Sequence, residues 1–279
     1  MIVDRYIKYR DTKWALSNLQ NILYYEGDFE NWEEASSVAA QYGEAYEQES
    51  ILEQVGEATA KVRNGDAAYE QDGVLFDKLS VDYQLISAFL YIYSQTQRLK
   101  VIDYGGALGS IFFRYRKLWD KIETDWSIIE QPHFVEYGRK KVPEIKFYYG
   151  IEEYDGVADV LLLASILMYI DDVYVFFSSL LKKRIRYIIV DRTAFSPDDQ
   201  DIITLQYVPE QIYKAVYPAH LISNTRFKKL VTDSGYTIIS EWDHTQGGIT
   251  LKKDRKFVDT LEKGYLLEYV EKIDSLVAE

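Results

Sequence analysis

Apolar positions in the first third of the chain recur mostly at three- and four-residue spacing. The segments 32–41, 51–63 and 83–93 all follow this pattern. Such spacing places apolar side chains on one face of a helix, and Asn64-Gly65-Asp66 supplies a stop signal after the second segment. No strong strand pattern occurs before about residue 97. The sequence therefore predicts a helical N-terminal cap region over residues 1–97.

From residue 99 onward, short β-rich runs alternate with helical stretches, which is typical of a mostly parallel sheet with helices on both faces. We expect a Rossmann-like, doubly wound α/β domain over residues 98–254. Its last two β-rich runs are separated by residues 243–247, a loop short enough for an antiparallel edge hairpin. The β-rich runs are 99–104, 126–130, 146–149, 159–164, 187–191, 236–242 and 248–253.

The last part of the chain, residues 255–279, is expected to hold one amphipathic helix, because apolar residues in 257–277 recur at three and four. This C-terminal helix should pack on its own domain, with a homodimer contact as the alternative. The longest apolar stretch, 160–170, is shorter than the roughly 18 residues of a membrane span. The N-terminus alternates charged and apolar residues, unlike a secretory signal.

Composition narrows the classes of function. The 32 Lys and Arg against 45 Asp and Glu give a formal charge of -13, which repels phosphate backbones and argues against a nucleic-acid partner. The absence of cysteine excludes disulfides, thiolate metal sites and cysteine nucleophiles, and it is compatible with the cytoplasmic localisation that we expect. The acidic residues Asp198, Asp199 and Asp201 lack the spacing of a calcium loop, so no metal site is predicted.

The most informative motif is VIDYGGALGS, residues 101–110, which reads as a strand, a glycine-rich turn and the start of a helix. In doubly wound sheets, ligands bind at the carboxyl ends of strands. Gly105, Gly106 and Gly109 let the backbone turn sharply and approach a ligand. The stretch 110–119 can then present a helix N-terminus to that ligand.

Spacing within this turn separates two classes of cofactor. The dinucleotide fingerprint started at Gly105 requires glycine at positions 107 and 110, which hold Ala107 and Ser110. The methyltransferase pattern of an acid followed by alternate glycines falls on Asp103, Gly105 and Gly109, with Ala107 as its only exception. A nicotinamide-dependent oxidoreductase is therefore the less favoured alternative.

Glu130 ends the next predicted strand, where an acidic side chain can accept hydrogen bonds from ribose hydroxyls. Both cofactor classes use such an acid, so Glu130 supports nucleotide binding without choosing between them. The candidate cofactor-binding residues are Asp103, Tyr104, Gly105, Gly106, Ala107, Gly109, Glu130 and Gln131.

Methyl transfer requires an aligned acceptor and, for a hydroxyl acceptor, removal of its proton. His133 lies beside the predicted cofactor site and is a candidate base, with a structural or adenine-side role as the alternative. His220 is a second candidate for a catalytic role, because it lies in a region where substrate-facing loops occur. Asp191 with Arg192 can orient a substrate or form a structural ion pair. His244 is expected to be solvated in the hairpin loop.

Five blocks of the chain resemble a largely uncharacterised bacterial family of S-adenosylmethionine-dependent methyltransferases, a family associated with surface-polysaccharide biosynthesis. The resemblance extends from about residue 24 to residue 242. The blocks are VIDYGGALGS (101–110), WSIIEQPHFVEYG (126–138), DVLLLASILMYIDD (159–172), IIVDRTAF (188–195) and LQYVPEQIYKAVYP (205–218).

The resemblance implies a class I methyltransferase fold with S-adenosylmethionine over the turn at residues 103–109. Asp103 would then lie near the amino-acid portion of the cofactor, and Glu130 would bind its ribose. The implied enzyme moves a methyl group to a small-molecule or sugar-containing acceptor, at oxygen. A non-catalytic binding or scaffold protein that keeps this fold is the alternative.

Overall fold

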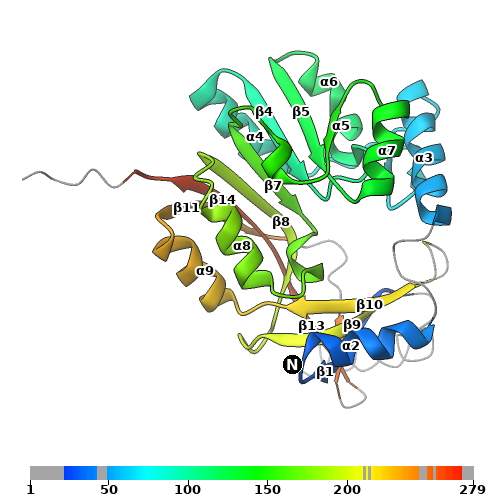
Figure 1. Cartoon of the computed structure of the whole chain (residues 1–279), viewed down its shortest axis with the longest axis vertical. Coiled ribbons are helices and arrows are strands. Elements are labelled where there is room, and N and C mark those ends of the chain that lie inside the picture. Colours follow the sequence, from blue (N-terminus) through cyan, green and yellow to red (C-terminus); the bar gives the residue numbers. More distant parts are fainter. Residues whose placement is uncertain are drawn as a thin grey trace, which may run out of the picture.

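The computed structural model describes residues 22–42, 49–209, 212, 215–244, 250–253 and 256–271. They form a seven-stranded central sheet, a five-stranded second sheet and the small hairpin of β2 (Tyr69–Gln71) and β3 (Val74–Phe76) (Figure 1). The strands of the central sheet are β4 (Leu99–Tyr104), β5 (Thr124–Ile129), β6 (Lys146–Tyr148), β7 (Val160–Ala164), β8 (Tyr187–Phe195), β11 (Tyr236–Asp243) and β14 (Leu261–Tyr269).

The strand order of the central sheet is β6-β5-β4-β7-β8-β14-β11. The first five strands are parallel, whereas β14 runs antiparallel to both β8 and β11. This order, with one reversed strand inserted next to the edge, is that of the class I methyltransferase fold, so the predicted Rossmann-like α/β class is confirmed. The order reverses at β4, and ligands of doubly wound sheets bind outside the carboxyl ends of the strands at such a point.

Helices cover both faces of the central sheet. Side chains of α3 (Glu49–Asn64), α4 (Tyr83–Thr96) and α7 (Pro132–Lys141) share one buried hydrophobic cluster with the sheet. On the other face, α8 (Val173–Leu181) and α9 (Asn224–Asp233) share a second cluster. Adjacent β4 residues alternate between them, since Val101 joins the first cluster and Ile102 the second. None of the described helices is long and apolar enough to cross a membrane.

The second sheet is assembled from three separate segments of the chain. Its order is β10 (Ala215–Leu221), β9 (Ile202–Val208), β1 (Tyr24–Phe29), β12 (Thr250–Lys253) and β13 (Lys256–Asp259), and α2 (Trp32–Ala39) packs against β9 and β10.

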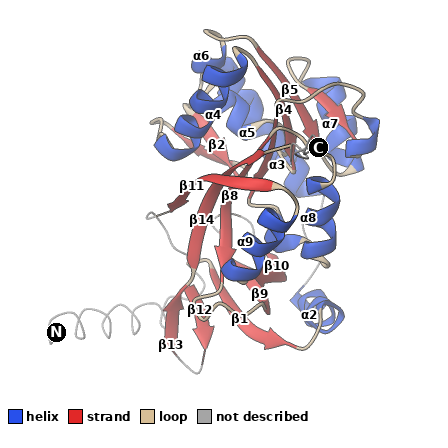
Figure 2. Ribbon diagram, turned by 90° about the vertical axis from the view of Figure 1, so that its left-hand side faces the viewer, coloured by secondary structure: helices blue, strands red, loops and turns tan. Residues whose placement is uncertain are grey.

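A hydrophobic cluster joins this sheet to the central sheet. Tyr25, Leu221 and Leu251 of the second sheet pack with Ala194 of β8 and with Met168, which lies in the single turn η4 (Leu167–Tyr169) just after β7. Figure 2 shows β8 and β14 running from the central sheet toward the second sheet. The second sheet therefore lies next to the carboxyl edge of the central strands.

The expected C-terminal helix is wrong over its described part, because residues 256–269 form β13 and β14. Tyr265, Leu266 and Leu267 are all buried, with β14 paired to β8 on one side and β11 on the other. A strand covered on both faces is apolar at consecutive positions, and such a run also satisfies helical spacing. Since these residues form strands, they do not support a homodimer contact through a C-terminal helix. Residues 272–277 lie outside the described residues.

The predicted edge hairpin is also wrong in its partner, since β11 pairs with β14 and β12 belongs to the second sheet. The three predicted N-terminal helices are present as α2, α3 and α4, but β1 and the β2–β3 hairpin also fall within residues 1–97. The expected boundaries at 97/98 and 254/255 therefore do not separate the two sheets.

Candidate functional site

The carboxyl edge of the central sheet carries three non-glycine residues with left-handed backbone. They are Ala107 after β4 (φ 49), Ser165 after β7 (φ 56) and Arg192 in β8 (φ 45), one residue beyond the last pair of its parallel ladder with β7. Such conformations cost about 1–3 kcal/mol each and concentrate at functional sites. Their presence on three neighbouring strands marks this edge as the candidate site.

The glycine turn has the geometry that its sequence predicts. Gly105 (φ 75) donates its N–H to the carbonyl of Ile129 at 2.9 Å, and Gly109 (φ 98) donates to the carbonyl of Gly106 at 2.9 Å. Positive φ at these two positions favours glycine. The expected single helix over 110–119 is interrupted at Tyr115, which separates α5 (Ser110–Arg114) from α6 (Arg116–Trp119).

Asp103 lies beneath this turn and is 1 % exposed. Trp126 donates its indole N–H to the carboxylate at 3.3 Å, and a Cβ added to Gly106 would lie 2.5 Å from Asp103 Cγ. Burial raises the pKa of Asp103 to about 7, although the Trp126 hydrogen bond opposes this shift. Asp103 therefore changes charge near neutral pH.

Glu130 follows β5 and connects to the same turn. One oxygen of its half-buried carboxylate accepts the N–H of Ala107 at 3.3 Å, and the other accepts the N–H of Gln131 at 2.6 Å. Burial raises the pKa of Glu130. The structure thus brings Asp103, the glycine turn and Glu130 together. Gln131 is exposed, and Tyr104 packs edge-on against a ring of α8.

Carboxylates predominate around the turn. Besides Asp103 and Glu130, the buried Glu70 of β2 accepts the hydroxyl of Ser110, and Arg192 is the cation whose charge acts on Asp103. An anionic pyrophosphate would be repelled here, whereas a cationic ligand would be attracted. This charge distribution favours a sulfonium- and ammonium-bearing cofactor over a dinucleotide.

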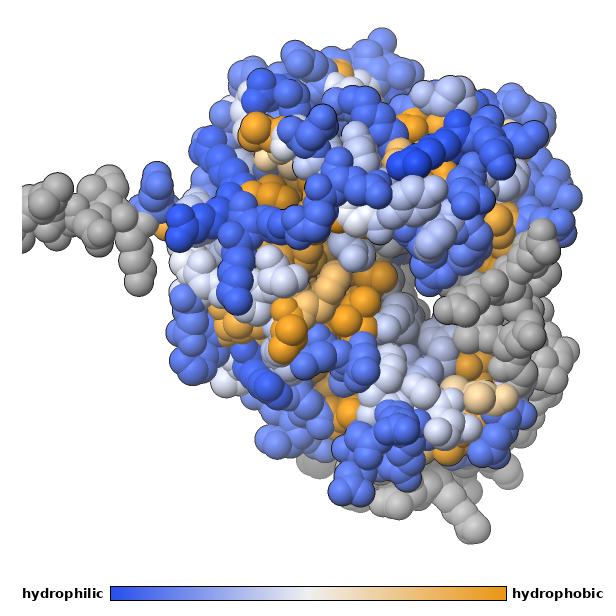
Figure 3. All heavy atoms as spheres, viewed as in Figure 1, coloured by the Kyte–Doolittle hydropathy of each residue, from blue (hydrophilic) through white to orange (hydrophobic). Residues whose placement is uncertain are grey.

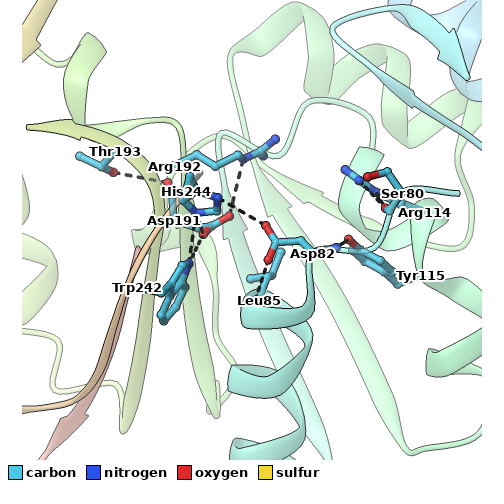
Figure 4. A network of polar contacts seen from close by, with 10 residues as sticks. All are labelled: Ser80, Asp82, Leu85, Arg114, Tyr115, Asp191, Arg192, Thr193, Trp242 and His244. Carbon is cyan, nitrogen blue, oxygen red and sulfur yellow. Dashed lines mark hydrogen bonds and ion pairs between the residues drawn. The ribbon is translucent and has the colours of Figure 1, made fainter. Parts of the chain in front are cut away.

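A second polar group lies where the parallel ladder of β8 with β7 ends and just after β11 (Figure 4). Asp191 is fully buried, and its Oδ1 lies 2.8 Å from Nε2 of His244 and 3.2 Å from Nε1 of Trp242. The other ring nitrogen of His244 lies 3.8 Å from Oδ2 of Asp82, the N-cap of α4, whose Oδ1 accepts the N–H of Leu85 at 3.0 Å. The imidazole therefore lies between two carboxylates.

The expectation that His244 is solvated is wrong, because its side chain is 14 % exposed. Burial disfavours its positive charge, but the hydrogen bond to Asp191 and the charges of Asp191, Asp82 and Glu262 outweigh that effect and raise the pKa of His244. The carboxylates around the ring thus favour its protonated form.

Asp82, Asp191 and His244 each offer a ligand atom within 4.8 Å of the others, close enough to consider a metal ion. Two features oppose that use. The two ring nitrogens face different carboxylates, so only one can contact a given ion, and both the Trp242 N–H and the Arg192 guanidinium, with Nε at 3.6 Å, already approach Asp191. The arrangement suits a proton better than a metal cation.

The other two histidines lie elsewhere. His220 is on β10, where its Nε2 contacts the carbonyl of Asp171 at 2.8 Å, its ring stacks on Trp32 with centroids 4.8 Å apart, and burial lowers its pKa. His133 lies in the first turn of α7, packs on Phe134, and has a buried Nε2 that finds no hydrogen-bond partner among the described residues. The structure joins Asp191 to His244 rather than to either predicted histidine.

Comparison with known proteins adds a likeness of fold. No protein-family model matches the chain, and no characterised protein matches it in sequence. Solved structures resemble it at low identity. A methyltransferase of Methanosarcina mazei that depends on S-adenosylmethionine is 12% identical with a TM-score of 0.46, over 65% of this chain and 97% of that one.

Two further structures show the same level of likeness. The Burkholderia thailandensis 1,6-didemethyltoxoflavin-N1-methyltransferase, solved with S-adenosylhomocysteine, is 11% identical with a TM-score of 0.44, over 82% of this chain and 92% of that one. The N-terminal domain of EvdMO1, solved with S-adenosylhomocysteine and D-fucose, is 11% identical with a TM-score of 0.47, over 81% and 98%. At such identities the likeness concerns the fold alone.

Sequence reasoning missed His244, Trp242 and Asp82 as members of the site. His244 and Asp191 are 53 residues apart, and Asp82 is a helix cap that precedes both strands. One of the three could have been found from the sequence. Asp82 directly precedes the predicted helix at 83–93, which is the position of an N-cap residue, so its carboxylate is expected at the start of that helix. The positions of Trp242 and His244 depend on the pairing of β11 with β14.

Proposed function

We propose that this chain is a methyltransferase that uses S-adenosylmethionine and methylates a small-molecule or sugar-containing acceptor at oxygen. The observation that supports the proposal best is the meeting of Asp103, the glycine turn and Glu130 at the point where the strand order reverses. The excess of carboxylates there matches the positive charge of the cofactor.

Residues of the turn fit this cofactor. Glu130 would accept the ribose hydroxyls, because a carboxylate offers about four lone-pair positions and the described residues give it two backbone donors. Asp103 would bind the amino-acid ammonium, and Gly105 and Gly106 would allow close backbone approach. When bound, the cofactor supplies an activated methyl group on a sulfonium.

The acceptor is proposed to enter between the carboxyl edge and the second sheet, where the surface is hollowed (Figure 3). Asp191 and Arg192 border this edge. The buried Nε of Arg192 has no hydrogen-bond partner among the described residues and lies 3.6 Å from Oδ2 of Asp191. Its N–H donors beside carboxylate acceptors suit a polyhydroxylated ligand.

The two remaining histidines are given other roles. His133 is proposed to contact the adenine side of the cofactor, and His220 is proposed to support the second sheet.

Cofactor binding tests the proposal directly. We expect the full chain to bind S-adenosylhomocysteine in isothermal titration calorimetry, and Glu130→Gln to weaken that binding by about tenfold or more, because charge-assisted hydrogen bonds contribute roughly 1.5–3 kcal/mol. Glu144→Gln, which changes an exposed ion pair with Arg63, is the matched control and should leave binding unchanged.

Three results would contradict the proposal. Absence of binding to both S-adenosylmethionine and S-adenosylhomocysteine would refute it. Binding of NADH in their place would indicate an oxidoreductase. Tight cofactor binding without methyl transfer to hydroxyl or amine acceptors would indicate a non-catalytic protein of this fold.

A further inference from the structure

We infer that His244, held by Asp191, is the base that takes the proton of the acceptor hydroxyl during methyl transfer. This inference rests on the proposed function and adds to it the residue that handles the proton. It stands on the placement of one imidazole between two carboxylates at the carboxyl edge of the sheet.

Two groups approach Nε2 of His244: Oδ1 of Asp191 at 2.8 Å and the indole Nε1 of Trp242 at 3.1 Å. The carboxylate is the closer of the two and can only accept, so we assign the hydrogen to Nε2, which donates it to Asp191. Trp242 donates to the same oxygen and holds it in place. In the neutral ring, the basic lone pair is therefore on Nδ1.

Nδ1 is the nitrogen that remains available. Its contact with Asp82 Oδ2, at 3.8 Å, is too long for a hydrogen bond. An acceptor hydroxyl can donate to Nδ1 in the neutral ring, and once Nδ1 is protonated, the Asp82 carboxylate stabilises the imidazolium. A base oriented by one carboxylate and charged beside another has the groups that general-base catalysis requires.

The position of the pair connects it with the proposed cofactor site. Asp191 is the last residue of the parallel ladder between β8 and β7, and His244 directly follows β11, so both lie at the same carboxyl edge as the glycine turn. Arg192 acts electrostatically on both Asp103 and Asp191, so the two groups border a common region. We assign Asp191 as a positioning residue, because it acts through His244.

The transfer balances as follows. The acceptor oxygen forms a bond to the methyl carbon while its proton moves to His244 Nδ1. The carbon–sulfur bond breaks, and its electron pair stays on sulfur, which becomes a neutral thioether. The proton on Nδ1 then leaves to solvent, for which the 14 % exposure of the side chain gives a route.

Charges around the ring restrict the acceptor class. Asp191, Asp82 and Glu262 face His244 from β8, α4 and β14, with Arg192 as the cation of the group. This surplus of carboxylates repels phosphate and carboxylate acceptors. A neutral sugar hydroxyl fits best, and turnover should rise with pH as Nδ1 loses its proton.

The chain has three histidines, so its imidazole spectrum is small enough to assign. Nitrogen-15 NMR of the full chain should show His244 as the Nε2–H tautomer with a pKa above 6.5. Asp191→Asn should lower that pKa by about one unit or more, because it removes the charge that acts most strongly. The signals of His133 and His220 serve as internal controls and should stay unchanged.

A second experiment measures activity. Neutral monosaccharides are supplied as methyl acceptors, and release of S-adenosylhomocysteine is followed. His244→Gln should lower kcat by about 100-fold or more, while its affinity for S-adenosylhomocysteine stays within about twofold. Asp82→Asn keeps a capping oxygen and should lower the pKa of His244, which tests the assignment even where His244→Gln folds poorly.

Several outcomes would overturn the inference. They are an Nδ1–H tautomer, a His244 pKa insensitive to Asp191→Asn, wild-type kcat in His244→Gln, or no turnover of any neutral monosaccharide by a chain that binds the cofactor. Loss of activity on chelation by EDTA would assign the group to a metal instead. Failure of the wild-type chain to bind S-adenosylhomocysteine would refute the proposed function itself. Calorimetry measures that binding independently of activity, so the two failures can be told apart.

Discussion

Replacing Asp103 with asparagine is expected to stabilise the protein above pH 7 and, at the same time, to weaken its binding of S-adenosylmethionine. The folded-state pKa of Asp103, about 7, lies above the ordinary value of 3.8 because burial disfavours its charge. Between these two values the folded chain holds more protons than the unfolded chain, so stability falls as pH rises from about 4 to 7. The full cost above pH 7 is on the order of 4 kcal/mol, and asparagine does not incur it.

Urea unfolding at pH 5 and pH 8 measures this effect. The variant should exceed the wild type at pH 8, with a smaller difference at pH 5. Asp125→Asn is the control, because Asp125 is partly exposed and paired with Lys146, and its effect should stay within about 1 kcal/mol at both values. A variant less stable than the wild type at pH 8 would contradict the burial argument.

Binding of S-adenosylhomocysteine should move in the opposite direction. At pH 6 only about a tenth of Asp103 is ionised if its pKa is about 7, so wild-type affinity should rise about tenfold between pH 6 and pH 8. The Asp103→Asn variant should bind weakly without that rise. An affinity of the wild type that does not depend on pH would refute the role of this carboxylate in holding the ammonium.

The second large effect is expected from Gly264→Ala. A Cβ at position 264 of β14 would overlap the indole of Trp242 on β11, which pairs with Gly264 across the strands. Overpacking of this kind costs typically 1–3 kcal/mol, and displacement of the indole would break its hydrogen bond to Asp191. We therefore expect a lower unfolding temperature together with a changed tryptophan fluorescence spectrum.

The matched control is Gly150→Ala, because a Cβ at Gly150 meets nothing within 4 Å. This variant should unfold within about 0.5 kcal/mol of the wild type, as for most surface substitutions. Equal stability of the two variants would show that the Trp242 ring is free to move away, and would contradict its role in holding Asp191.

The sequence alone predicted the parallel core of the sheet and the glycine turn. The runs at 99–104, 159–164 and 187–191 are short, apolar and bounded by polar residues, and they coincide with β4, β7 and the first part of β8. Local pattern is sufficient there, because helices cover both faces of these strands, so that nearly every position is apolar. Positive φ at Gly105 and Gly109 is a local requirement too.

Only the tertiary structure decided the C-terminal third and the second half of the site. Tyr265 to Leu267 carry an apolar pattern that fits a helix or a strand buried on both faces, and the insertion of β14 between β8 and β11 selects the strand. That same pairing carries His244 to Asp191, 53 residues away. Residue types and spacings therefore determine the local backbone and the cofactor turn. The charge and orientation of a buried imidazole depend instead on which distant strands pair, and that pairing is determined by the packing of the whole sheet.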